Sequence, residues 1–152
     1  MSALALDFRE YTFIDVGSGK GRALLLAAEY GFRRIIGIEL LPELDRIARA
    51  NVKKLLDGKG KANQANIELV RSDATEFPFP PEPTIVFLFN PLPASKLRAL
   101  FRNIEESICR NPRSLYIAYA NPVLGHVIES YPWLTKVGSS ARYSLFRSLA
   151  GR

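Results

Sequence analysis

Cysteine and histidine are almost absent from this sequence. Cys109 is the only cysteine and His126 the only histidine among 152 residues. A single cysteine excludes an internal disulfide framework and is typical of proteins kept in a reducing compartment. One histidine and one cysteine are also too few for a structural zinc cluster. We therefore expect a cytoplasmic protein without a metal site.

Long apolar runs are missing as well. No stretch approaches the roughly 20 apolar residues needed to cross a bilayer. Residues 1–10 include Asp7, Arg9 and Glu10 and lack the apolar core of a secretory signal. The composition, 47% hydrophobic and 24% charged, is close to the globular average. We expect one globular domain over residues 1–152, with no membrane partner.

Positive charge is in excess but is not concentrated. The formal net charge is +6 and the sequence pI is about 9.7, which can attract nucleic acid or other acidic partners. The one dense stretch, residues 53–61, contains four lysines and follows a helical pattern. We interpret it as a solvated helix end and loop, so that nucleic acid is a partner the sequence permits but does not favour.

Strand-like and helix-like segments alternate along the chain. Apolar, β-rich segments are typical of strands at residues 11–16, 34–40, 67–72, 84–89, 114–120, 134–138 and 143–149, and helical patterns cover residues 20–30, 42–56, 94–109 and 123–130. The proline-rich stretch 76–83 leaves no room for a helix between the third and fourth strands. The first five strands are nearly continuous apolar runs, as expected of parallel strands that are covered on both faces. The pattern predicts a doubly wound α/β fold.

A glycine-rich loop joins the first strand to the first helix. Asp15 ends the strand, and Gly17, Gly19 and Gly21 then fall on alternate residues, with Ser18 between the first two. Glycines are needed where the backbone turns tightly and lies against a ligand, because a Cβ would stand in between. Between a predicted strand and a predicted helix, such a loop indicates a nucleotide site.

The spacing narrows the choice of nucleotide. A Walker A loop requires the order Gly-Lys-Ser/Thr after four variable residues, whereas here Lys20 precedes Gly21. The dinucleotide fingerprint requires a glycine at the position of Arg22. Asp15 would also repel a pyrophosphate. S-adenosylmethionine (SAM) has no phosphate and carries an amino group and a sulfonium, so an acid at the strand end favours it. A nicotinamide-dependent oxidoreductase stays a disfavoured alternative.

Two further acids end the next two strands. Glu39, followed by Leu40, lies about 20 residues past the loop, where an acidic side chain accepts hydrogen bonds from the ribose hydroxyls of a nucleotide. Asp73 and Ala74 follow the third strand, and a carboxylate there beside a backbone N–H can read an adenine edge. The alternatives are a solvated carboxylate at position 39 and an ordinary Asx turn at Asp73.

Together these residues resemble a known family. The segment 15–21, Glu39 and the segment 72–74 are similar to the first three cofactor motifs of the class I, Rossmann-like SAM-dependent methyltransferases. The resemblance implies a seven-stranded, mostly parallel sheet with the last strand antiparallel and helices on both faces. It also implies SAM as cofactor and S-adenosyl-L-homocysteine (SAH) as product, with Asp15, Gly17, Ser18, Gly19, Gly21, Glu39, Leu40, Asp73, Ala74 and Asn90 as cofactor-binding residues.

Asn90 and Pro91 end the fourth strand and are the predicted catalytic residues. They resemble the start of the Asn-Pro-Pro-aromatic motif of methyltransferases that act on nitrogen, in which the asparagine accepts hydrogen bonds from the target N–H groups. Leu92 and Pro93 depart from that motif, which argues against a nucleobase acceptor. We expect an amine, an amide or a protein side chain. A proline-terminated strand with a turn asparagine is the structural alternative.

Weaker candidates and other functional classes remain open. Tyr116, Tyr119 and Tyr143 are expected in the core or the pocket wall, and Asn121-Pro122 is a second strand-ending pair that could line the pocket. The chain could also be a non-catalytic SAM-binding module or the core of a larger enzyme. Neither the oligomeric state nor the methyl acceptor follows from the sequence.

Overall fold

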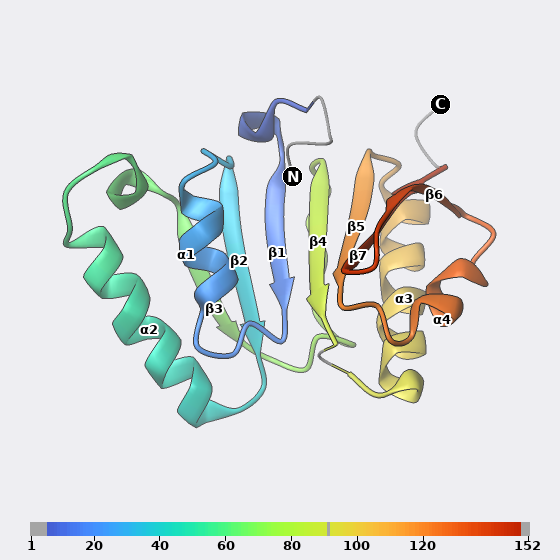
Figure 1. Ribbon diagram of the computed structural model, residues 1–152, viewed down its shortest axis with the longest axis horizontal. Coiled ribbons are helices and arrows are strands. Elements are labelled where there is room, and N and C mark those ends of the chain that lie inside the picture. The colour runs from blue at the N-terminus through green and yellow to red at the C-terminus, as the bar shows by residue number, and fades with distance from the viewer. Residues whose placement is uncertain (1–5, 91, 150–152) are drawn as a thin grey trace.

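A seven-stranded sheet with helices on both faces forms the protein (Figure 1). The structure is a computed structural model that describes residues 6–90 and 92–149. The strands are β1 (Thr12–Val16), β2 (Arg34–Glu39), β3 (Ile67–Arg71), β4 (Thr84–Phe89), β5 (Leu115–Ala120), β6 (Leu134–Ser139) and β7 (Tyr143–Ser148). The helices are α1 (Arg22–Ala28), α2 (Pro42–Leu56), α3 (Ala94–Arg110) and α4 (Gly125–Glu129), with short 3₁₀ turns η1 (Phe8–Glu10) and η2 (Lys61–Gln64).

The strand order is β3-β2-β1-β4-β5-β7-β6. Strands β1 to β5 pair in parallel, and β7 is antiparallel to both β5 and β6. This arrangement confirms the predicted Rossmann-like fold, including the antiparallel last strand. The order reverses between β1 and β4, and the carboxyl ends of these two strands are where ligands bind in such sheets.

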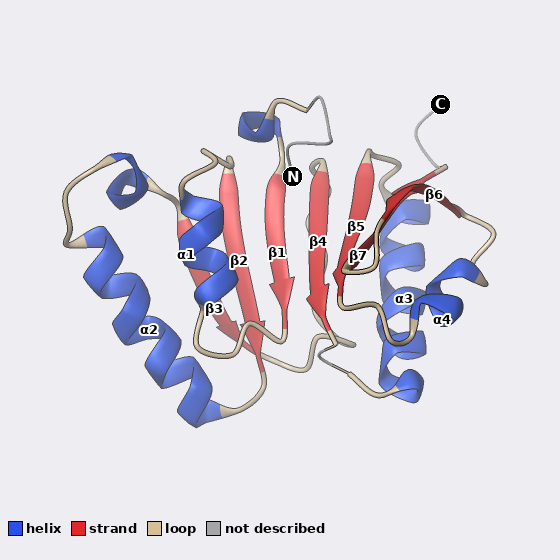
Figure 2. Ribbon diagram, viewed as in Figure 1, coloured by secondary structure: helices blue, strands red, loops and turns tan. Residues whose placement is uncertain are grey.

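Alternate side chains of the strands face two separate cores. Phe13, Ile35 and Ile85 pack with α1 on one face, and Ile14 and Val86 pack with α3 and α4 on the other. This alternation follows from the two-residue period of a strand. The two groups of helices accordingly lie on opposite sides of the sheet (Figure 2).

The helix boundaries differ in detail from the prediction. Helix α1 begins at Arg22 and not at residue 20, because Gly19 and Gly21 have positive φ angles of 55° and 83° and so are outside any helix. Helix α2 begins at Pro42 as predicted, since the missing N–H of a proline costs nothing in a first turn. Helix α4 has only five residues and ends at Glu129.

No helix connects β3 to β4, as the prolines predict (Figure 2). Phe77 and Phe79 from this connection pack into the core under α3. Helix α3 fixes the connection through its side chains, because Asn103 donates to the Phe77 carbonyl at 2.8 Å and Ser107 to the Phe79 carbonyl at 3.3 Å. The loop between β3 and β4 therefore contributes apolar side chains to the core, as the helices do elsewhere in the fold.

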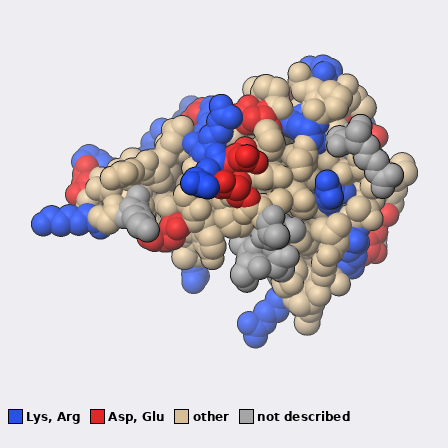
Figure 3. All heavy atoms as spheres, turned by 90° about the horizontal axis from the view of Figure 1, so that it is seen from above, with Lys and Arg blue, Asp and Glu red and all other residues tan. Residues whose placement is uncertain are grey.

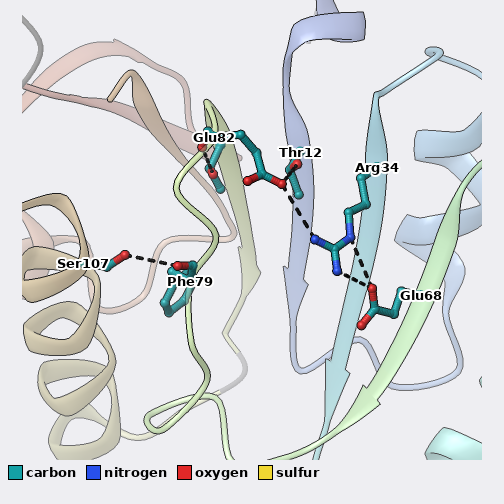
Figure 4. A network of polar contacts seen from close by, with 7 residues as sticks. Thr12, Arg34, Glu68, Phe79, Glu82 and Ser107 are labelled. Carbon is teal, nitrogen blue, oxygen red and sulfur yellow. Dashed lines mark hydrogen bonds and ion pairs between the residues drawn. The ribbon is translucent and has the colours of Figure 1, made fainter. Parts of the chain in front are cut away.

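A polar network holds the amino ends of the strands together (Figure 4). Arg34 of β2 pairs with Glu68 of β3 and reaches Glu82 at 3.7 Å, while Thr12 of β1 donates to Glu82 at 3.2 Å. Seen from this end, basic and acidic side chains are intermixed on the surface (Figure 3). Nothing in this network resembles a ligand site, so the opposite ends of the strands are the candidates.

One property bears on partners. Among the described residues, no helix is both long enough and apolar enough to cross a membrane.

Candidate functional site

The glycine loop passes over the carboxyl end of β2. The backbone N–H groups of Gly17 and Ser18 both donate to the Ile38 carbonyl, at 2.9 and 3.0 Å. Gly17, Gly19 and Gly21 have φ angles of 70°, 55° and 83°, a conformation that costs a residue with a Cβ roughly 1–2 kcal/mol. The alternate glycines are therefore required by the backbone path of the loop.

The three glycines meet different surroundings. A Cβ on Gly21 would lie 3.4 Å from the Cβ of Ala48, so this glycine lets α1 and α2 approach each other. A Cβ on Gly19 would meet nothing within 4 Å. Because Gly19 lines a cavity, that Cβ would project into the space of a ligand.

Glu39 is buried and holds the loop in place. One carboxylate oxygen accepts the Gly19 N–H at 2.9 Å, and the other accepts the Leu41 N–H at 2.8 Å. Each carboxylate oxygen can accept two hydrogen bonds, so one lone pair on each remains for a ligand. Glu39 thus couples the glycine loop to the start of α2 and is not a solvated strand-end acid.

A cavity of about 530 Å³ lies beside this loop, within the size range of ligand sites. It is lined by Val16, Gly17, Gly19, Ile38, Glu39, Leu40, Leu41, Leu44, Ser72, Asp73, Ala74, Leu92, Pro93 and Lys96. Six of these are predicted cofactor residues, brought together from the ends of β1, β2 and β3. We call this space the first cavity.

Asp73 has an unforeseen partner at the far wall of the first cavity. Its Oδ1 accepts hydrogen bonds from the backbone N–H and the hydroxyl of Thr75, at 2.9 and 2.7 Å, which makes the Asx turn that the sequence left open. Its Oδ2 accepts from Lys96 Nζ at 2.7 Å. The bond from Lys96, and next those from Thr75, lower the pKa of Asp73 to about 2.

A second cavity of about 510 Å³ lies on the α1 side of the sheet. Its lining comprises Asp15, Gly17, Ser18, Lys20, Arg22, Ala23, Leu26, Phe87 and Phe89. Gly17 lines both cavities. On this face no described helix lies over β4 and β5 (Figure 1), and Phe89 is 64% exposed.

Asp15 and Ser18 are the buried polar residues of the second cavity. Asp15 is 3% exposed, and burial, followed by the negative charge of Glu39, raises the pKa of Asp15 to about 7. The hydroxyl of Ser18 is buried without a hydrogen-bond partner. A buried donor without a partner and a buried acid are groups that a polar, cationic ligand would satisfy.

Asn90 directly follows β4 and has a left-handed conformation, with φ of 45°. Its Oδ1 accepts a hydrogen bond from the Tyr119 hydroxyl at 2.5 Å, and that hydroxyl accepts the Leu124 N–H at 3.3 Å. Because the tyrosine oxygen receives the backbone proton, its own proton points to Asn90. The orientation of the Asn90 amide is therefore fixed by a residue of the neighbouring strand.

The other predictions at the strand ends have mixed outcomes. Asn90 borders neither cavity directly, although Phe89 before it lines the second and Leu92 after it lines the first. Pro91 lies outside the described residues. Asn121 also has a positive φ, of 48°, but neither it nor Pro122 lines either cavity. Tyr119 is buried, as predicted for a core residue, and its bond to Asn90 was not predicted.

The model of a family described as a methyltransferase domain matches residues 13–109. No curated protein matches the chain in sequence.

Solved structures share the fold at low sequence identity. An RNA methyltransferase from Salinibacter ruber, in complex with SAH, has a TM-score of 0.60 and 21% identity over 97% of this chain and 84% of its own. The N-methyltransferase NodS from Bradyrhizobium japonicum has a TM-score of 0.62 and 17% identity over 91% and 85%. A ribosomal protein L11 methylase from Lactobacillus delbrueckii subsp. bulgaricus has a TM-score of 0.57 and 15% identity over 90% and 69%.

The family match covers the glycine loop, Glu39, Asp73 and Asn90, and the fold around them is that of the predicted class. The chain belongs to the methyltransferase domain family and is a Rossmann-like methyltransferase that uses SAM.

Proposed function

We propose that this protein transfers a methyl group from SAM to a nitrogen atom of a small molecule or a protein side chain. The observation that carries the proposal is the fixed amide of Asn90 at the end of β4, next to the point where the strand order reverses. An amide oxygen accepts two hydrogen bonds. Tyr119 uses one, and the second is free to accept an N–H of the acceptor.

The residues of the two cavities fit the cofactor. Glu39 would hold the ribose, Asp73 and Ala74 the adenine edge, and Asp15 the cationic amino group. The open space above Gly19 and the unpartnered Ser18 hydroxyl support this assignment. Gly17, which lines both cavities, would let one ligand extend from the first into the second.

Little acid–base chemistry is required of the protein. When bound, SAM supplies a methyl group already activated by its sulfonium. The chain has to hold the acceptor in line with that methyl, and good orientation alone contributes up to roughly 7–11 kcal/mol. Asn90 would orient the acceptor, Tyr119 would keep Asn90 in place, and the apolar walls of the second cavity would exclude water.

The second cavity is the proposed entrance for the acceptor. Leu26, Phe87 and Phe89 give it an apolar wall, and two of them are more than half exposed. The name of NodS, an N-methyltransferase on the same fold, is consistent with a nitrogen acceptor. The single, exposed Cys109 is consistent with the cytoplasm as the location.

A methylation screen tests the proposal. The chain is incubated with SAM and a panel of amines, amides, peptides and RNA, SAH formation is measured, and the methylated atom is identified by mass spectrometry. We expect turnover with at least one amine, amide or peptide and the methyl group on nitrogen. A methyl group found only on oxygen or carbon would contradict the nitrogen proposal, while the SAM-dependent family would stand.

A further inference from the structure

Lys96, in the first turn of α3, donates a hydrogen bond to Asp73, a predicted cofactor-binding residue. From the geometry of the first cavity we infer that Lys96 sets the affinity of the adenine end of the site by competing for Oδ2 of Asp73. The inference rests on the proposed cofactor assignment of Asp73. It adds an affinity- and specificity-determining residue outside the three cofactor motifs.

The hydrogen bonds of Asp73 leave little choice to a ligand. A carboxylate oxygen accepts two hydrogen bonds, and Oδ1 already receives both from Thr75. A ligand N–H must therefore approach Oδ2, where Lys96 Nζ at 2.7 Å already takes one of the two acceptor positions. Lys96 lines the same cavity as Asp73 and Ala74, so a ligand donor at the second position of Oδ2 would lie next to the positively charged ammonium group that is bonded to the same oxygen.

The pair is strong enough to compete and weak enough to be displaced. The Lys96 side chain is 52% exposed and that of Asp73 is 24% exposed, which makes this a partly solvated ion pair. The upper half of the small net stability that such pairs contribute corresponds to an ion pair formed roughly 70–85% of the time. The bond to Asp73 raises the pKa of Lys96, so the lysine stays charged at neutral pH and can leave only by moving toward solvent.

The size of the effect follows from the population of the competent state. If the pair is open about 15–30% of the time, the apparent affinity is lowered about three- to sixfold relative to a site without the lysine. The loss applies to ligands that donate an N–H to Asp73. A ligand with a carbonyl in place of the adenine amino group lacks the 6-amino donor, and Lys96 can donate to that carbonyl.

The test is the binding of SAH, and of its inosine analogue, to purified variants by calorimetry. We expect Lys96→Met to bind SAH about three- to sixfold more tightly than the unchanged chain. Arg98→Met, two residues along α3 and also exposed, removes the same charge away from the cavity and should leave the dissociation constant unchanged. The inosine analogue, to whose carbonyl Lys96 can donate, should gain less from Lys96→Met than SAH does.

A second background ties the effect to the carboxylate. In Asp73→Asn the ion pair is already lost, so adding Lys96→Met should have no further effect on SAH binding. If the single variant Lys96→Met, with Asp73 unchanged, bound SAH equally well or more weakly than the unchanged chain, the inference would be overturned and the proposed function would stay intact. An unchanged chain that fails to bind SAH at all would overturn the cofactor assignment and the inference with it.

Discussion

Asp15 illustrates how one buried acid links folding to ligand binding. An unfolded chain releases the Asp15 proton near the ordinary pKa of 3.8, and the folded chain releases it at about 7. Between these values the unfolded state binds fewer protons, so the contribution of Asp15 to stability falls as the pH rises from about 4 to 7. Ionised Asp15 is therefore a cost to the fold that a cationic ligand can offset.

We predict that Asp15→Asn stabilises the free protein at pH 8 by about 2–4 kcal/mol, since a pKa difference of one unit corresponds to about 1.4 kcal/mol. At pH 4 the two proteins should unfold alike. The unchanged chain should bind SAM about tenfold more tightly at pH 8 than at pH 6, because Asp15 ionises in this interval. In Asp15→Asn the side chain does not titrate, so any change of SAM affinity with pH in this variant comes from the ligand itself. An equal pH dependence of SAM affinity in both proteins would mean that Asp15 does not contact the ligand.

Gly19 offers a test that separates backbone strain from ligand contact. Gly19 and Gly31 both have positive φ angles, 55° and 71°, and a Cβ on either would meet nothing within 4 Å. Alanine should cost the fold about 1–2 kcal/mol at each position. Only Gly19 lines the first cavity.

Gly19→Ala should therefore weaken SAH binding about tenfold or more, corresponding to at least ~1.4 kcal/mol, while Gly31→Ala binds normally. Thermal unfolding and calorimetry of the pair provide the comparison. Similar SAH affinities in the two variants would mean that the loop is structural only.

At the scale of the elements, the glycine loop depends on the strand beneath it. Gly37 of β2 is paired with Asp15 of β1. A Cβ on Gly37 would lie 2.6 Å from Leu24, 2.9 Å from the Ser18 hydroxyl and 3.0 Å from Leu69. Contacts this short require the packed side chains of Leu24, Ser18 and Leu69 to shift.

Gly37→Ala is predicted to destabilise the fold by about 1–3 kcal/mol, the usual cost of overpacking a core, and to weaken SAH binding through Ser18. Gly125→Ala in α4, whose Cβ would make only an ordinary contact at 3.7 Å with Pro122, is the matched control. Unfolding and SAH titrations of the two variants measure both effects. If Gly37→Ala were destabilised but bound SAH with unchanged affinity, the packing of β2 against Ser18 would not affect the ligand site.

The elements also show why some features could be predicted and others could not. Pro42 and the prolines of residues 76–83 act through their own backbone, so the start of α2 and the missing helix before β4 followed from the sequence. The contacts of Lys96 with Asp73 and of Tyr119 with Asn90 join residues 23 and 29 positions apart. Local patterns contain no signal for such pairs, because they depend on how α3 and β5 lie against the strand ends.

At the scale of the whole molecule, the two ends of the sheet have different tasks. Ion pairs of Arg34 with Glu68 and Glu82, together with the hydrogen bond from Thr12 to Glu82, join the amino ends of β1, β2 and β3 (Figure 4). Both cavities lie beside the carboxyl ends. The switch in strand order between β1 and β4 brings Asp15 and Asn90 to the same edge. A site assembled from loops that follow four strands can change its acceptor without changing the fold.

We propose that Asn90 orients a nitrogen acceptor and, contrary to the expectation from the sequence, does not hold the cofactor, since it lines neither cavity. The most direct test compares Asn90→Ala with the unchanged chain in turnover of an acceptor from the methylation screen and in SAM binding by calorimetry. We predict that kcat falls on the order of a hundredfold, as for the loss of one orienting hydrogen bond in a transition state, with SAM affinity unchanged within about twofold. An Asn90→Ala variant that keeps its full rate, or that loses SAM binding in proportion to its rate, would show that Asn90 does not orient the acceptor.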